Sequence, residues 1–183
     1  MNIEERKAIE YLILVFLGVK NAPVTLTHLQ KEIFLLWNFD SRMKDFIRFI
    51  KHKMGPYSPE LSMIVKNPKY LQNSWVYIES TNMKGGKVCL TTDGHKKAKE
   101  IIDEMTSDDK LRTFLTGIKL TRELYEKLTV QELLLLIYEA YPEFKIYSTV
   151  LEDIKNKKEL YAMRILKKGI IDEKKYDEII KCF

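Results

Sequence analysis

Hydrophobic residues recur at helical spacing through the first fifty positions, in stretches separated by short polar breaks. The first stretch predicts a helix over residues 3–17, the second over residues 28–37 and the third over residues 42–53. Asn2, followed three residues later by Glu5, forms a capping-box pattern at the start of the first helix. The amino-terminal part of the chain is therefore expected to be a group of helices.

The string H-K-M-G-P-Y-S-P-E-L at residues 52–61 interrupts this pattern. Gly55 can end the third helix in a left-handed conformation, and Pro56 cannot continue it. Ser58 is a good helix cap, and Pro59 suits the first helical position, where its missing N–H has no cost. The string predicts a sharp turn between two helices, the second of them short.

The period then changes from helical to extended. W-V-Y-I-E at residues 75–79 and V-C-L-T at 88–91 are rich in residues that favour strands. Gly85 and Gly86 lie between them, which predicts a β-hairpin. A further helix is expected over residues 92–105.

Beyond residue 107 the pattern is helical throughout. Short helices are expected over 111–118 and 122–127. Thr129 with Glu132 forms another capping box, ahead of the strongly apolar V-Q-E-L-L-L-L-I-Y-E-A-Y. Further helical segments follow to the carboxyl end.

Helices followed by a β-hairpin and another helix are the layout of a winged helix-turn-helix domain, with the hairpin as the wing. We predict an α+β fold that is mostly α, with a two-stranded β-hairpin wing and a C-terminal helical extension. Residues 1–106 would form the winged-helix domain and residues 107–183 the extension.

Composition narrows the class of protein. The chain has 183 residues, is 45% hydrophobic and carries a net charge of +5. No apolar run approaches the ~20 residues that span a bilayer, and the acidic start M-N-I-E-E-R is unlike a signal peptide. Cys89 and Cys182 match no metal or redox spacing. The sequence predicts a cytoplasmic protein that has no membrane partner.

No motif requires catalysis. The histidines, His28, His52 and His95, lie in separate predicted helices without a neighbouring cysteine or a spaced pair of aspartate and histidine. The phosphate-loop, zinc-protease, nucleophile-elbow and dinucleotide-binding patterns are all absent from the sequence. We therefore predict a non-enzymatic protein with no catalytic residue, no metal site and no cofactor.

Basic residues point to nucleic acid. A winged helix places one helix in the major groove, and lysine and arginine contacts to phosphates supply much of the affinity. The helix after Ser58 offers few base-reading side chains, so backbone contact is favoured over sequence-specific recognition. The same lysines are also typical of an ordinary solvated surface. The candidate DNA-binding residues are Arg42, Lys44, Arg48, Lys51, Ser62, Lys66, Lys69, Lys84, Lys87 and Lys97.

Aromatic residues near the string keep a second interpretation open. Tyr57 has no capping role in the turn, and Tyr70 follows the short helix. Aromatic side chains are enriched at interface hot spots. Tyr57 and Tyr70 are therefore candidate partner-binding residues. The leucine-rich segment Leu133–Leu136 could be core or a dimer seam.

Three strings together resemble a known family. They are L-Q-K-E-I-F-L-L at 29–36, G-P-Y-S-P-E-L at 55–61 and L-T-T-D-G-H-K-K-A at 90–98. They are similar to the YwgA-like and SocA-like (Panacea) winged-helix proteins of bacteria and archaea, and the resemblance spans roughly residues 5–105. There, an L-x-K-L-x-F-L-L-type helix precedes a G-P-Y or G-P-V turn, and L-T-x-x-G follows the wing. Glu32 departs from this pattern, because family members often carry an apolar residue there.

The resemblance implies a winged helix and either of two roles. Some members resemble antitoxins that neutralise a toxin by direct contact, and others look like transcriptional regulators. The expectation is a DNA-binding regulator or antitoxin-type component, with double-stranded DNA as its partner. The alternative is a protein–protein interaction module, bound to a toxin-like partner or forming a homodimer, without specific DNA binding.

Overall fold

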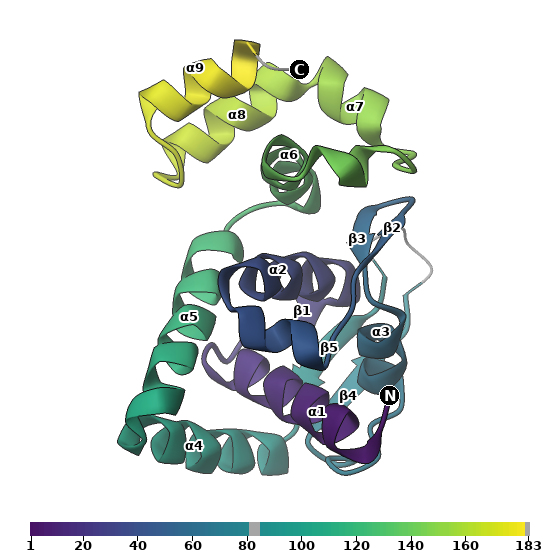
Figure 1. Cartoon of the computed structure of the whole chain (residues 1–183), viewed down its shortest axis with the longest axis vertical. Helices are drawn as coiled ribbons and strands as arrows, with labels where there is room; N and C mark the ends of the chain where they lie inside the picture. Colours follow the sequence, from purple (N-terminus) through teal and green to yellow (C-terminus); the bar gives the residue numbers. More distant parts are fainter. Residues whose placement is uncertain (81–84, 182–183) are drawn as a thin grey trace.

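The structure, a computed structural model, describes residues 1–80 and 85–181. It is an α+β fold, mostly helical, with small antiparallel sheets. Figure 1 shows α1, α2, α3 and the sheets grouped in one part of the molecule, with α4 at its base. Helix α5 runs along one edge from α4 towards α6, and α7, α8 and α9 lie beyond α6.

The first two helices form where the sequence predicts them. Helix α1 spans Ile3–Gly18, and both hydrogen bonds of the Asn2–Glu5 capping box are present. The short strand β1, Val24–Thr25, leads directly into α2, Leu26–Phe39. Thr25 caps α2 by accepting a hydrogen bond from the backbone of His28.

The predicted third helix over residues 42–53 is wrong. The chain makes a single 3-10 turn, η1 at Ser41–Asp45, and then forms the strand β2 at Ile50–His52. Strand β3, Gly55–Tyr57, pairs antiparallel with β2. The G-P-Y string is therefore the second strand of a hairpin, and Gly55, at φ +76°, opens that strand instead of ending a helix.

Packing against distant parts of the chain explains the difference. The ring of Phe49 lies edge-on to Phe34 of α2, with the ring centroids 5.3 Å apart. Met43 and Ile47, whose spacing suggested a helix, are both buried. A single turn is enough to place these two side chains in the core. Beyond that turn, an extended chain brings Phe49 to Phe34 and lets β2 pair with β3.

The short helix and the hairpin that follow are confirmed. Helix α3 spans Pro59–Lys66, and the hydroxyl of Ser58 caps it by accepting a hydrogen bond from the backbone of Leu61. Strands β4, Trp75–Ile78, and β5, Lys87–Leu90, pair antiparallel. Strand β1 adds to the far side of β5, so the sheet has three strands in the order β1-β5-β4.

The remaining elements are helical, as predicted. Helix α4 spans Thr92–Ser107. Helix α5, Asp109–Tyr125, is one continuous helix where two short ones were expected. The carboxyl-terminal elements are α6 at Val130–Ala140, η2 at Pro142–Lys145, α7 at Leu151–Asn156, α8 at Lys158–Lys167 and α9 at Glu173–Lys181.

The interior has two hydrophobic clusters. The first gathers buried residues of α1, α2, α3, the sheet and α4, and takes Leu115 and Ile118 from α5. The second gathers residues of α6 to α9, and it includes Phe34 from α2. The predicted domain boundary at residue 106 stays a prediction, but packing continues across it, and the two clusters divide between α5 and α6.

The leucine-rich segment belongs to the second cluster. Leu133, Leu134 and Leu135 are fully buried, and Leu136 is partly buried. These residues are core.

Across the described ranges, no helix combines the length and the apolar character that crossing a bilayer requires.

Candidate functional site

Two of the sequence strings that carry the family resemblance touch each other. The side-chain amide of Gln30 donates to the backbone oxygen of Ser58 at 2.9 Å, and its oxygen accepts from the Ser58 N–H at 2.9 Å. Next to it, the ammonium of Lys31 donates to the backbone oxygen of Pro56 at 2.8 Å. Helix α2 thus holds the G-P-Y-S-P segment by its backbone and sets the position at which α3 begins.

Lys31 makes this contact from inside the protein. Its side chain is 2% exposed. Burial disfavours the charged form and lowers the pKa of Lys31 to about 7. No pattern in the sequence marks Lys31 as buried, because lysine is among the residues least often found inside proteins.

Strand β3 is also pressed against α6. A Cβ atom at Gly55 would lie 2.6 Å from Cδ2 of Leu134, which is fully buried. The hairpin therefore links α2 to the carboxyl-terminal helices.

The loop after α3 is held by a buried carboxylate of α1. Glu10 is fully buried, and it accepts hydrogen bonds from the backbone N–H groups of Lys69, Tyr70 and Leu71 at 2.7–2.8 Å. Arg6 pairs with the same carboxylate at 3.2 Å. Glu10 thus fixes the backbone that carries two of the predicted site residues, although its place inside an apolar helix face gave no hint of this role.

The predicted basic residues of the third segment lie on η1, on β2 and between them, because no helix forms there. Arg42 is paired with Asp40 at 2.5 Å, and this hydrogen bond lowers the pKa of the Asp40 carboxyl. Lys44 stacks over the ring of Trp37. Arg48 borders a small cavity that Glu5, Asp45 and Glu60 also line. Acidic side chains therefore offset much of the positive charge that was predicted for this segment.

The other candidate DNA-binding residues that the structure describes are exposed, apart from Ser62. Ser62 is 8% exposed on the inner face of α3, so its side chain is poorly placed for the predicted DNA contact. The ammonium of Lys66 lies over the ring of Tyr77 in β4. Lys84 falls outside the described residues. Four other lysines lie on the surface: Lys51, Lys69, Lys87 and Lys97. No carboxylate of the described chain lies within 4 Å of the ammonium group of any of these four lysines or of Lys66.

The two predicted partner-binding tyrosines, Tyr57 and Tyr70, have different neighbours in the structure. Tyr57 is partly buried and stacks on His52, with the ring centroids 4.7 Å apart. Tyr70 is 37% exposed, and the ammonium of Lys7 lies over its ring. The structure therefore does not bring Tyr57 and Tyr70 together in one direct contact.

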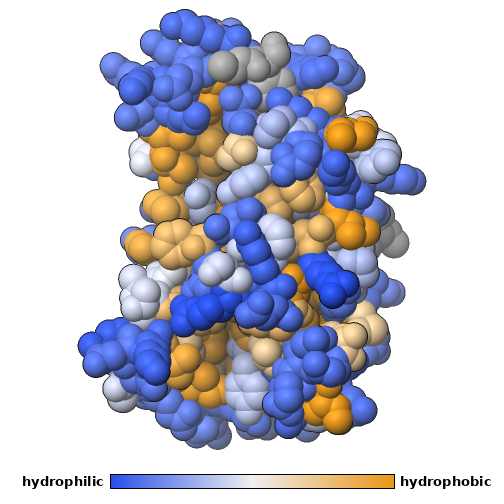
Figure 2. All heavy atoms as spheres, in the orientation of Figure 1, coloured by the Kyte–Doolittle hydropathy of each residue, from blue (hydrophilic) through white to orange (hydrophobic). Residues whose placement is uncertain are grey.

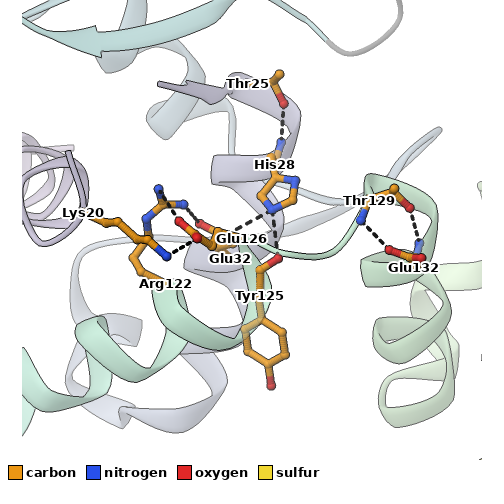
Figure 3. Close-up of polar contacts among 9 residues, drawn as sticks. All are labelled: Lys20, Thr25, His28, Glu32, Arg122, Tyr125, Glu126, Thr129 and Glu132. Carbon is orange, nitrogen blue, oxygen red and sulfur yellow. Dashed lines mark hydrogen bonds and ion pairs between the residues drawn. The ribbon is translucent and has the colours of Figure 1, made fainter. Parts of the chain in front are cut away.

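An ionic cluster with a buried centre, drawn in Figure 3, joins α2 to α5 and to Lys20, which follows α1. Arg122 is 2% exposed, and it donates to the fully buried carboxylate of Glu32 at 2.5 Å. Nε2 of His28 lies 3.1 Å from the other Glu32 oxygen. Glu126 lies 3.9 Å from Arg122 and pairs with Lys20 after the end of α1. Glu32, the residue that departs from the family pattern, is thus matched by an arginine ninety positions away.

A cavity of about 470 Å³ opens beside this cluster, lined by His28, Arg122 and Glu126 together with residues near β1 and the start of α6. Arg122 and Glu126, one turn apart at the end of α5, lie 3.9 Å from each other in its lining, so their charges offset each other. Within the described chain, no group of three histidine, cysteine or acidic side chains is arranged to hold a metal ion. The ion pairs of the cluster therefore hold α2 against α5.

A second buried carboxylate fastens the carboxyl-terminal helices. Glu132 completes the predicted capping box with Thr129 (Figure 3). The same carboxylate oxygen accepts from the ammonium of Lys168 at 2.7 Å. The start of α6 is thereby tied to the end of α8.

Comparisons with known proteins add no further identification. No protein-family model matches the chain, and no curated protein matches it.

Proposed function

We propose that the amino-terminal part of the chain is a winged helix that binds double-stranded DNA through the phosphate backbone. The order of elements supports this proposal. Helix α1, strand β1, helices α2 and α3 and then the β4–β5 hairpin follow one another, and the sheet order is β1-β5-β4. In this interpretation the β2–β3 hairpin is an insertion between α2 and α3.

The observation that carries the proposal is a set of lysines without acidic partners around α3. Lys66 ends α3, Lys69 follows it on the backbone that Glu10 holds, and Lys87 begins β5. Lys51 lies on β2, the partner of the strand that leads into α3. Unpaired ammonium groups on a backbone fixed by hydrogen bonds are suited to phosphates, because little order is lost on binding.

Sequence-specific recognition has less support. The outward stripe of α3 consists of Pro59, Met63 and Lys66, so it offers a single donor for base edges. Glu60 lies in the first turn of the same helix and would repel phosphates. We therefore propose backbone binding by a non-enzymatic regulator or antitoxin-type component, with weak preference among sequences.

Charge reversal tests the proposal. Lys69→Glu combined with Lys87→Glu removes two phosphate contacts, so affinity for a random-sequence duplex at 0.1 M salt should fall on the order of 10- to 100-fold. Lys167→Glu combined with Lys174→Glu makes the same change in net charge on the carboxyl-terminal helices and should leave affinity nearly unchanged. Melting temperatures of both variants should match that of the wild type.

Equal losses in the two double variants would show that only net charge matters. A wild-type affinity that both variants retain would remove α3 and the hairpin from the binding surface.

A protein–protein interaction module is the second candidate, and an apolar groove favours it. The groove lies between the end of α2, α5 and the start of η2, with Phe39 73% exposed at its edge. Such a patch on a monomer marks interaction surfaces. This role does not exclude DNA binding, because the groove is lined by other elements than α3 and the β4–β5 hairpin.

A further inference from the structure

The apolar groove is built on one face of α5. Its volume is about 360 Å³, and Gly117, Leu120 and Leu124 line it from α5. The ring of Phe39 packs over Gly117, where an added Cβ would lie 3.4 Å from it. The end of α2 therefore forms a wall beside α5.

The hydrophobic side chains around this groove are unusually exposed. Phe39 is 73% exposed, Leu120 49% and Leu124 40%. Single exposed hydrophobic residues are common, but a contiguous set on one groove is not. Figure 2 shows hydrophobic surface along the edge of the molecule where α5 approaches the carboxyl-terminal helices.

We propose that this groove is a homodimer interface, in which α5 packs antiparallel against α5 of a second copy of the chain. In a two-fold symmetric contact, residue i of one copy faces residue j of the other, and j faces i. A two-fold axis that passes between the two α5 helices, level with residues 121 and 122, places Leu120 opposite Leu124 of the second copy. The apolar pair is thus complementary to itself.

The charges beside this pair obey the same symmetry. Lys119 and Glu123 are exposed, four positions apart, and flank the two leucines. Neither has an ion-pair partner in the described chain. The same axis brings Lys119 beside Glu123 of the second copy, twice in the dimer. This match favours a second copy over an unrelated helix, which would need both signs of charge in the same register.

The axis confines the α5–α5 contact to the last two turns of the helix. Residues 119–125 of one copy lie opposite residues 119–125 of the other, and the start of α5 extends past the end of the second copy's α5. The inference goes beyond the proposed DNA binding and does not rest on it.

Sedimentation equilibrium of the full chain tests the dimer. We expect the wild type to be dimeric at concentrations of tens of micromolar. Leu120→Glu should weaken dimerisation more than about 100-fold, because it buries a charge twice in the interface. Leu111→Glu is the matched control: Leu111 is 42% exposed on α5 but lies nine residues away, on the opposite face of the helix. It should leave the dimer intact.

A charge swap distinguishes a self-complementary interface from any other. Lys119→Glu places like charges together twice and should weaken the dimer about tenfold or more. Lys119→Glu combined with Glu123→Lys restores opposite charges and should restore dimerisation. Circular dichroism melting confirms that each variant is folded.

Three results would overturn the proposal. They are a wild type that stays monomeric at about 200 µM, equal weakening by Leu111→Glu and Leu120→Glu, and a charge swap that fails to restore the dimer. A monomeric chain that instead binds another protein through the groove would also count against it.

Discussion

Gly55 and Gly169 form a matched pair at the scale of single residues. Both have a left-handed backbone, at φ +76° and +68°. A Cβ at Gly55 would meet buried Leu134 at 2.6 Å, whereas a Cβ at Gly169 would meet nothing within 4 Å. Gly169→Ala should lower the free energy of unfolding by about 1–2 kcal/mol, which is the cost of a left-handed backbone for alanine. Gly55→Ala should cost about 3 kcal/mol or more, since it adds a clash in the core.

Urea unfolding of the two variants measures the difference. A larger loss for Gly55→Ala supports the packing of β3 on α6. Equal losses would mean that this packing contributes nothing.

Lys31 makes folding depend on pH. Its pKa is about 7 in the folded protein and about 10.5 in the unfolded chain, so the unfolded state binds the extra proton between these values. The free energy of unfolding should therefore rise with pH across this window, by about 1.4 kcal/mol per unit. Below pH 7 the stability is lowered by the full free-energy cost of burying the charged Lys31 ammonium.

Lys31→Met should flatten this rise between pH 7 and 9 and stabilise the protein at pH 6, although the oxygen of Pro56 loses its donor. Denaturant unfolding at several pH values gives the profile. Parallel wild-type and variant profiles would show that Lys31 is not buried as a neutral amine.

At the scale of elements, the Arg122–Glu32 pair joins α5 to α2. Arg122→Met leaves a fully buried carboxylate without its main partner, and should cost about 3–5 kcal/mol. Adding Glu32→Met removes that unpaired charge, so the double variant should be more stable than Arg122→Met alone. Thermal unfolding compares them, and a double variant as unstable as the sum of both single variants would contradict the pairing.

The elements that could be predicted from sequence are those set by local chemistry. Asn2 with Glu5, Ser58, and Thr129 with Glu132 cap their helices as expected, and the β4–β5 hairpin follows its strand formers. Residues 42–53 could not be predicted, because their apolar spacing fits a helix while Phe34 and β3 select an extended chain.

The candidate site was predictable only in part. Lys66, Lys69 and Lys87 lie on the surface as expected, but Ser62 faces inward and Arg42 is paired with Asp40. The groups that position the site act across long sequence separations. Glu10 binds the backbone of residues 69–71 and Gln30 binds Ser58, and no local pattern reveals such pairs.

At the scale of the whole molecule, α2 contributes to both hydrophobic clusters. Phe34 lies in the second cluster, and Trp37 packs against both. The same helix holds the G-P-Y-S-P segment and contributes Glu32 to the ionic cluster. A surface around α3 is therefore connected, through α2, to the carboxyl-terminal helices.

The affinity of the wild-type protein for a random-sequence DNA duplex, measured across salt concentrations, tests the account most directly. If Lys51, Lys66, Lys69 and Lys87 neutralise about four phosphates, the logarithm of the association constant should fall with the logarithm of salt concentration with a slope of about −3 to −4. No measurable binding at ~50 mM salt, or binding that does not change with salt, would contradict the proposed backbone contact.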